Sequence, residues 1–186
     1  MLNKTLLSIV KILDKHSIPY MIIGGYAVLY HGHARFTEDI DIVVGVDASY
    51  LENILEAVSG KFLSRTENTK AFVRQTNVLP LLEAEDEVRV DLIFSFLEFE
   101  RNAIIRSDKT SIEQQTINIV KAEDLIVYKI LAGRARDIDD IESILDHKKG
   151  KINIEQVTAN IMDLSTALAD DSLIAKWEEI YSSFSN

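Results

Sequence analysis

The sequence contains no cysteine, which excludes disulfide bonds and thiolate metal sites. Proline and glycine are also scarce, with 2 and 7 residues among 186, and the chain shows no low-complexity tract, internal repeat or obvious linker. Collagen-like and disordered chains have different compositions, so both classes are excluded. A cysteine-free chain fits a reducing compartment, and we expect the protein to be cytoplasmic.

Long hydrophobic runs are missing as well. A helix that crosses a bilayer needs ~20 consecutive apolar residues, and every apolar run in this chain is short. Residues 1–15 carry apolar side chains at helical intervals with lysines between them. They lack the continuous apolar run and the small-residue cleavage site of a secretory signal. We therefore expect no membrane segment and no membrane partner.

Positive charge is in short supply. Lysine and arginine number 20 against 30 acidic residues, which gives a net charge of −10 and a pI near 4.9. General nucleic-acid binders usually present a basic surface, so this class is disfavoured. One local basic strip contains Lys61, Arg65, Lys70 and Arg74. An ordinary solvated face is the favoured interpretation of this strip, and contact with RNA is the alternative.

The hydrophobic fraction of 47% is enough for one packed core with a small helical extension. Short β-prone runs predict strands, and apolar residues at i, i+3, i+4 and i+7 predict helices. The expected strands are 20–23, 40–46, 71–74, 78–82, 88–94 and 117–120, with a hairpin across 75–77. The expected helices cover 6–13, 26–30, the segment after Asp47, 122–134, 138–147 and two stretches between 154 and 184.

These elements predict an α+β protein. A small mixed β-sheet flanked by helices is expected over residues 1–120. Residues 121–186 are expected to form a helical C-terminal part packed on that core, because only helical patterns occur there.

Two carboxylates mark the start of the expected strand 40–46. Side chains alternate between the faces of a strand, so Asp39 and Asp41 point the same way while Ile40 and Ile42 point the other way. Two adjacent carboxylates repel each other and are costly to bury. A divalent cation removes that cost, and hard oxygen ligands suit Mg²⁺. An exposed strand end, a helix N-cap or a turn is the alternative explanation for this pair.

A third carboxylate lies in the cleanly alternating run 88–94. Its apolar residues share one face, while Asp91 lies on the other face between Arg89 and Ile93. Taken alone, Asp91 is explained better by a salt bridge with Arg89 or a neighbouring arginine. If the two strands pair, the three carboxylates converge and can hold two metal ions roughly 3.5–4 Å apart.

A glycine pair, Gly24 and Gly25, follows the expected strand 20–23 and opens a short helix. Glycines allow a positive φ and a close approach of backbone N–H groups to an anion. Tight-turn glycines are common, so the pair is informative mainly because it precedes Asp39 and Asp41.

Taken together, these motifs resemble the nucleotidyltransferase superfamily related to DNA polymerase β. The matching residues are Gly24-Gly25-Tyr26-Ala27, His31-Gly32, Arg35-x-Thr37-x-Asp39-Ile40-Asp41 and Asp91. The pattern is most similar to the Gly-Gly subgroup that includes AbiEii-like toxins, and also to small antibiotic nucleotidyltransferases. The resemblance covers about residues 18–95 and continues more weakly through Lys129 to residue 140. Glu38 departs from it by adding a negative charge beside the motif.

The resemblance implies roles for individual residues. Asp39, Asp41 and Asp91 would be catalytic and would bind two Mg²⁺ ions, with Mn²⁺ as the alternative metal. The implied nucleotide-binding residues are Gly24, Gly25, Arg35, Thr37 and Lys129. Ion pairing with Glu123, Asp124, Asp137 or Asp140 is an equally weighted interpretation of Lys129.

The implied reaction moves a nucleoside monophosphate from a nucleoside triphosphate to an acceptor hydroxyl and releases pyrophosphate. The acceptor is left open among a protein, a tRNA and a small molecule. A toxin–antitoxin or abortive-infection role would add a cognate antitoxin as partner. An aminoglycoside or lincosamide nucleotidyltransferase is one alternative, and a non-catalytic antitoxin-type protein on the same fold is the other.

Histidines are the remaining candidates. His31 and His33 flank Gly32, but a zinc site needs more ligands than this pair supplies. A turn or helix-end position is therefore the favoured interpretation, with a place for His31 in the nucleotide pocket as the alternative.

Overall fold

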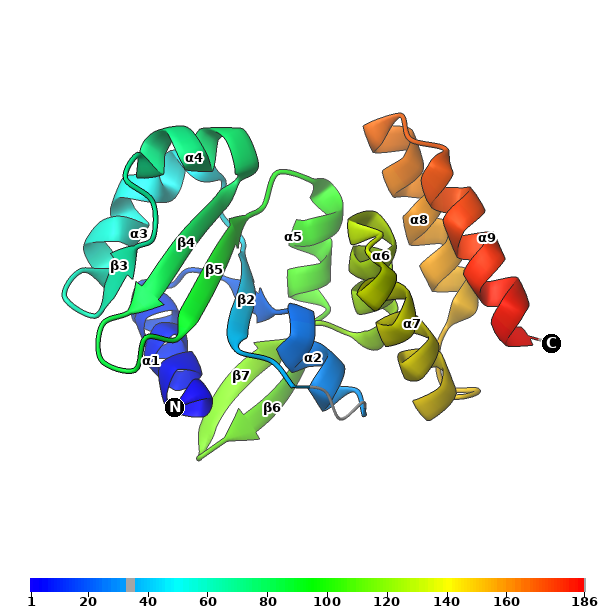
Figure 1. Ribbon diagram of the computed structural model, residues 1–186, viewed down its shortest axis with the longest axis horizontal. Helices are drawn as coiled ribbons and strands as arrows, with labels where there is room; N and C mark the ends of the chain where they lie inside the picture. Colours follow the sequence, from blue (N-terminus) through cyan, green and yellow to red (C-terminus); the bar gives the residue numbers. More distant parts are fainter. Residues whose placement is uncertain (33–35, 186) are drawn as a thin grey trace. The chain divides into compact units, whose positions relative to one another are not determined.

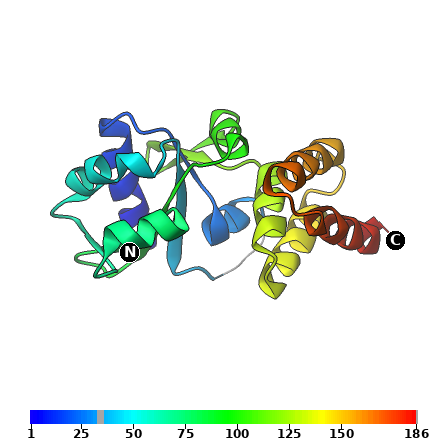
Figure 2. The same ribbon diagram turned by 90° about the horizontal axis from the view of Figure 1, so that it is seen from above.

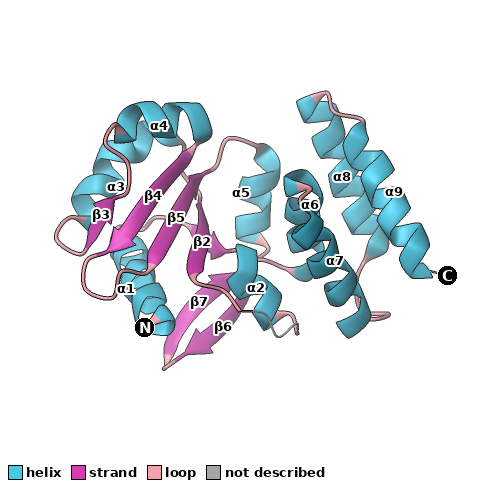
Figure 3. Ribbon diagram, viewed as in Figure 1, coloured by secondary structure: helices cyan, strands magenta, loops and turns pink. Residues whose placement is uncertain are grey.

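A computed structural model describes residues 1–32 and 36–185 of the chain. Its strands form one mixed, seven-stranded sheet in the order β3-β4-β5-β2-β1-β7-β6. The sheet is drawn in magenta in Figure 3. The strands are β1 Tyr20–Ile22, β2 Asp39–Val44, β3 Phe62–Ser64, β4 Val78–Glu83, β5 Arg89–Phe94, β6 Asp108–Ile112 and β7 Gln115–Ile119.

Helices precede, interrupt and follow the sheet along the chain (Figure 1). They are α1 Leu2–Lys15, α2 Gly24–Tyr30, the 3-10 turn η1 Ala48–Tyr50, α3 Leu51–Val58, α4 Thr69–Thr76, α5 Glu98–Ile105, α6 Ala122–Ala132, α7 Ala135–His147, α8 Ile154–Leu168 and α9 Ser172–Ser185. The expected α+β class, a mixed sheet with flanking helices and a helical C-terminal part, is confirmed.

The chain divides into two compact units. The first comprises Met1–Tyr26 and Phe36–Val120 and contains the sheet, and the second comprises Ala27–Arg35 and Lys121–Asn186. The second unit thus includes a short segment from the N-terminal half of the chain. A domain division into residues 1–120 and 121–186 stays a prediction.

One face of the sheet carries the core of the first unit. Because side chains alternate along a strand, Ile40, Ile42 and Val44 of β2 share a face, and each is fully buried. They belong to one apolar cluster with residues of α1 and α3, such as Ile9 and Ile54. Burial of this amphipathic pair of helices fixes which face of β2 is apolar, and it leaves the other face for polar side chains.

The opposite face is only partly covered by apolar groups. Met21 of β1 and Val43 of β2 lie side by side there and are fully buried. Helix α5 packs against β1 in this region, and its Ala103 is also buried. Toward the start of β2 the apolar residues give way to Asp39 and Asp41, which are only half-buried.

The expected strand 71–74 is wrong. This segment is helix α4, because the Asn68 side chain accepts a hydrogen bond from the Ala71 backbone N–H and caps its N-terminus. Val73 is buried on the core side of the helix. Asn77 ends the helix in the left-handed conformation, with φ 54°. Strand β4 follows directly and forms its hairpin with β5, not with the segment before it.

Three elements were not expected from the sequence: β3, α5 and β6. Strand β3 has three residues and pairs with β4 at the edge of the sheet. Strand β6 is an edge strand as well, paired only with β7 among the described residues. Edge strands bury little apolar surface, so neither has the alternating hydrophobic pattern that marks a strand.

The second unit is helical. Helices α8 and α9 lie side by side in both views (Figures 1 and 2), and Trp177 Nε1 of α9 donates a hydrogen bond of 2.9 Å to Thr158 Oγ1 of α8. Helix α6 is buried against α7, α8 and α9, because its apolar residues occupy most of its circumference. In the residues that the structure describes, no helix is both long enough and apolar enough to cross a membrane.

Candidate active site

Strands β2 and β5 bring the three predicted carboxylates to one face of the sheet. The strands run parallel, with Asp41 directly beside Asp91 and Asp39 directly beside Arg89. Residues in the same register of neighbouring strands project to the same face, and so do residues two apart on one strand. Asp39, Asp41 and Asp91 therefore share the face opposite the apolar core. Figure 1 shows β2 and β5 adjacent in the middle of the sheet.

Gly24 packs against this cluster. It has φ 63°, and a Cβ added there would lie 1.9 Å from Oδ2 of Asp41. Only glycine permits both this backbone conformation and this approach. The Ile23 N–H donates a hydrogen bond of 2.9 Å to the Asp41 carbonyl oxygen, which ties the end of β1 to β2. The first residue of α2 is thereby held directly against a carboxylate of the site.

Asp39 carries an unsatisfied oxygen. Its Oδ1 atom is buried and has no hydrogen-bond partner among the described residues, with Arg89 Nη1 4.0 Å away. A buried carboxylate oxygen without a donor is costly, and a cation is the ligand that relieves the cost. Thr37, one of the predicted nucleotide-binding residues, donates from Oγ1 to the Asp39 carbonyl oxygen at 3.1 Å. That bond holds the backbone where β2 begins.

Asp91 has a partner of its own. The guanidinium of Arg65 donates from Nη2 to Asp91 Oδ1 in a close ion pair. Arg65 is itself anchored, because its Nε donates to the Leu81 carbonyl oxygen at 3.2 Å and its backbone N–H donates to the Pro80 carbonyl oxygen at 2.9 Å. The sequence placed Arg65 in a basic strip of solvated residues, and only the pairing of β3 with β4 shows that it reaches the carboxylates.

The donor set fits a divalent metal in kind. Carboxylate oxygens are the ligands that Mg²⁺ and Mn²⁺ prefer, and Asp39, Asp41 and Asp91 supply them from one face. In the described ranges, however, no three such side chains lie close enough together to hold an ion as they stand. Asp91 Oδ1 is directed at the guanidinium of Arg65.

The other predicted nucleotide contacts have different surroundings. Gly25 is buried in the first turn of α2, and Arg35 lies outside the described residues. Lys129 is 6% exposed, and its Nζ donates to Asp137 Oδ1 at 2.9 Å and to Asp140 Oδ2 at 2.6 Å. The structure thus shows the ion-pairing interpretation of Lys129, and its contact with a nucleotide stays a prediction.

Asp137 belongs to a buried network of ion pairs between α6 and α7, in which it contacts both Lys129 and Arg134. Burial works against its charged form, but hydrogen bonds from Arg134 and Lys129 outweigh burial and hold the pKa of Asp137 below its ordinary value. Arg134 Nε donates to Asp137 Oδ2 at 2.7 Å. A buried pair of this kind is tolerated because both carboxylates and the ammonium are hydrogen-bonded.

Of the two histidines in the motif, His31 is described and His33 lies outside the described residues. His31 is buried, with its ring edge-on to Tyr30 at 5.0 Å between centroids. A Cβ on Gly32 would lie 2.0 Å from the His147 ring, so the turn after α2 also depends on glycine.

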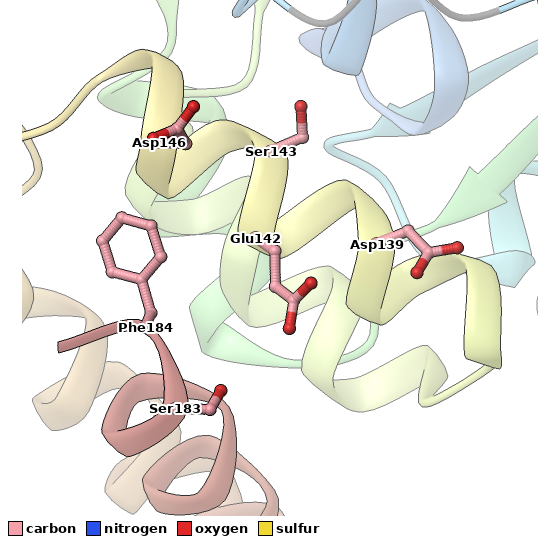
Figure 4. Close-up of a pocket in the computed structure, with 6 residues that line it drawn as sticks. All are labelled: Asp139, Glu142, Ser143, Asp146, Ser183 and Phe184. Atoms are coloured by element: carbon pink, nitrogen blue, oxygen red, sulfur yellow. The ribbon is translucent and has the colours of Figure 1, made fainter. Parts of the chain in front are cut away.

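A cavity of about 540 Å³ lies in the second unit, between α7 and α9 (Figure 4). Its lining residues are Asp139, Glu142, Ser143, Asp146, Ser183 and Phe184. The three acidic residues occupy one exposed helix face at intervals of three and four residues. An acidic helix face is ordinary solvated surface, and we assign no ligand to it.

Comparisons with known proteins identify a family and a shared fold. A sequence model of the family described as "Nucleotidyltransferase of unknown function (DUF6036)" matches residues 1–186. The structure is similar to a crystal structure of an antigenic nucleotidyltransferase-like protein from Paracoccidioides brasiliensis. That likeness has 22% identity and a TM-score of 0.55 and covers 92% of this chain and 91% of the other.

Two further solved structures share the fold. JHP933 from Helicobacter pylori has 20% identity and a TM-score of 0.50, over 98% of this chain and 85% of its own. The lincomycin-bound lincosamide antibiotic adenylyltransferase LnuA has 16% identity and a TM-score of 0.51, over 80% of this chain and 97% of its own. A search among curated proteins finds no match. The family match spans the whole chain, and the protein therefore belongs to this family of nucleotidyltransferases.

Proposed function

We propose that the protein is a metal-dependent nucleotidyltransferase that moves a nucleoside monophosphate from a nucleoside triphosphate to an acceptor hydroxyl. The observation that carries the proposal is the register of β2 and β5, which sets Asp41 beside Asp91. On the same face, Asp39 has a buried oxygen without a hydrogen-bond partner among the described residues. A purely structural role would not require three carboxylates in this arrangement, because like charges side by side are destabilising.

The reaction is an in-line displacement at the α-phosphorus. A bond forms between the acceptor oxygen and the α-phosphorus, the bond to the oxygen that bridges to the β-phosphorus breaks, and pyrophosphate leaves with those electrons. Asp91 on β5 is the residue we assign to accept the proton of the acceptor hydroxyl. Gly24 and Gly25 offer a backbone without side chains, against which a triphosphate can lie closely.

Asp39, Asp41 and Asp91 are the residues that would hold Mg²⁺ or Mn²⁺. When bound, two such ions stabilise charge on the attacking and leaving oxygens of the displacement. Gly24 packs against the Asp41 carboxylate and so limits its orientation, and the Thr37 hydroxyl holds the backbone at Asp39. Arg35 and Lys129 are the further residues proposed to contact the nucleotide.

The identity of the acceptor distinguishes the candidate physiological roles from one another. A tRNA 3′ end or a protein hydroxyl would suit a toxin-like enzyme with a cognate antitoxin. An antibiotic hydroxyl would suit a resistance enzyme, as the name of LnuA indicates for that protein. The net charge of −10 favours a small cationic acceptor over a polyanion.

Incorporation from α-labelled ATP, CTP, GTP and UTP with Mg²⁺ tests the proposal. The acceptors offered are the protein itself, total tRNA, an aminoglycoside and a lincosamide, and the control is the Asp39→Ala/Asp41→Ala double variant. Transfer that disappears in the double variant establishes the reaction and identifies the acceptor class. If neither transfer nor metal-dependent nucleotide binding is measured, the catalytic proposal is wrong and a binding role on the same fold replaces it.

A further inference from the structure

The guanidinium of Arg65 forms an ion pair with Asp91, the third carboxylate of the site. Its Nη2 atom pairs with Asp91 Oδ1, while Nε and the backbone N–H are hydrogen-bonded to consecutive positions of β4. The side chains of Arg65 and Asp91 are 29% and 31% exposed, so the pair is partly shielded from water. Two contacts fix the guanidinium and a third fixes the Arg65 backbone, and the ion pair is therefore a built part of the site and not a chance surface contact.

We propose that Arg65 is a positioning residue that competes with metal for Asp91. The inference rests on the proposed function, since it requires Asp91 to be a metal ligand. A cation that binds Asp91 Oδ1 must take this oxygen from the Arg65 guanidinium, because both approach the same atom. The free energy of metal binding is then reduced by the cost of breaking the Arg65–Asp91 ion pair.

The competition sets the order in which the site fills. Free metal binds weakly while Arg65 holds Asp91, because one of the three proposed ligands is then engaged by the guanidinium. A triphosphate that brings its own metal also brings negative oxygens, to which a released guanidinium can turn. Arg65 thereby favours metal that arrives with the nucleotide over metal alone.

Arg89 provides a comparison within the same cluster. It lies beside Asp39 in the sheet, but its Nη1 is 4.0 Å from Asp39 Oδ1 and its side chain is 59% exposed. The geometry therefore predicts a smaller effect for Arg89 than for Arg65, since an exposed pair at this distance is weak.

Titration of the nucleotide-free protein with Mn²⁺ alone measures the competition directly. Arg65→Gln is expected to bind Mn²⁺ about five- to tenfold more tightly than wild type, because Asp91 becomes available. Lys70→Gln is the matched control: it removes one positive charge from the same unit, where Lys70 pairs with Glu52 on α3 at 2.7 Å, and Mn²⁺ affinity should stay within about twofold. Thermal unfolding of each variant shows that it is folded.

A double-mutant cycle separates a direct effect from a general effect of charge. In an Asp91→Asn background, Arg65→Gln should no longer tighten Mn²⁺ binding, because the carboxylate for which the two cations compete is gone. Tighter binding in both backgrounds would show a long-range charge effect and would overturn the inference. Unchanged or weaker binding in the single variant would also overturn it and would leave Arg65 a structural residue.

The proposed metal site has its own readout in the same experiment. If Mn²⁺ affinity is unaffected by Asp39→Asn and Asp41→Asn, the carboxylates are not metal ligands, and the proposed function and this inference both fail. If those variants lose Mn²⁺ binding while Arg65→Gln changes nothing, the metal site stands and only the role of Arg65 is refuted.

Discussion

The Cα of Gly24 lies so close to Asp41 that an added methyl carbon would be 1.9 Å from the carboxylate Oδ2. Gly24 is the first residue of α2, and Asp41 is in the middle of the neighbouring strand β2. The turn after β1 and the strand that carries Asp39 and Asp41 are thus fitted to each other. A change at Gly24 must move Asp41, although the two residues are 17 positions apart in sequence.

Gly24→Ala should reduce nucleotidyl transfer by at least about 100-fold, since displacement of a catalytic group by ~1 Å can cost that much. It should also cost about 1–2 kcal/mol of stability, because φ is 63° at this position. Gly60→Ala is the matched control: its φ is 81°, and no described atom lies within 4 Å of the added carbon. Equal activity losses in both variants would show that backbone strain, not the contact with Asp41, is responsible.

Single substitutions of Asp39, Asp41 and Asp91 by asparagine should each lower transfer by at least about 100-fold, because each removes charge from the metal site. Thermal stability should hold or rise in Asp39→Asn and Asp41→Asn, since these variants relieve repulsion among like charges. It should fall in Asp91→Asn, which also loses the ion pair with Arg65. Glu38→Gln is the control on the same segment, with an exposed side chain, and its activity should match wild type. Full activity in an Asp39→Asn or Asp41→Asn variant would be incompatible with the proposed mechanism.

Lys129→Met should destabilise the protein by about 3–5 kcal/mol, because Asp137 and Asp140 lose the ammonium that neutralises them inside the helical unit. Urea unfolding measures the loss. Adding Asp137→Asn and Asp140→Asn should restore much of it by removing the buried charges. Lys151→Met, at an exposed position, should stay within about 0.5 kcal/mol of wild type. A Lys129→Met protein as stable as wild type would refute the structural role.

Glu100 should make the protein less stable as pH rises above 4.5. Burial raises the pKa of Glu100 above its ordinary 4.5, and hydrogen bonds from the Leu97 and Phe96 N–H groups only partly offset this. Between the unfolded and the folded pKa, the folded protein binds more protons, so stability falls as pH rises through this window. Glu100→Gln should flatten the dependence, as followed by urea midpoints from pH 4 to 7. Glu98→Gln, at the exposed start of α5, should retain it.

The sequence was sufficient to assign each of the three carboxylates to the polar face of its strand, because the local pattern reports side-chain direction. Alternation places Asp39 and Asp41 on one face and the isoleucines between and after them on the other, whatever the strand pairs with. Alternation in the run 88–94 likewise places Asp91 on the face opposite the apolar residues, and those apolar residues are buried as expected. The two strands needed only to be neighbours, and in the sheet they are.

Predictions of secondary structure from local sequence patterns were wrong or incomplete where helix capping or strand pairing decided the structure. Residues 71–74 contain β-prone side chains, but the Asn68 cap and the burial of Val73 made the segment helical. Strands β3 and β6 depend on partners for their hydrogen bonds, because their own sequences bury little apolar surface. The role of Arg65 was hidden for the same reason, since its reach to Asp91 exists only when β3 pairs with β4.

The sequence by itself determined the fold class, the strand face of each carboxylate and the glycine turn, because each follows from periodicity or from residue type over a few positions. The tertiary structure decided that the three carboxylates meet, because β2 pairs with β5. Only the tertiary structure decided which cations meet those carboxylates. Arg65, 26 residues from Asp91, became its partner, while Lys129 paired with Asp137 and Asp140. Charged side chains are long and their partners lie far away in sequence, so their pairing is fixed by the packing of strands and helices.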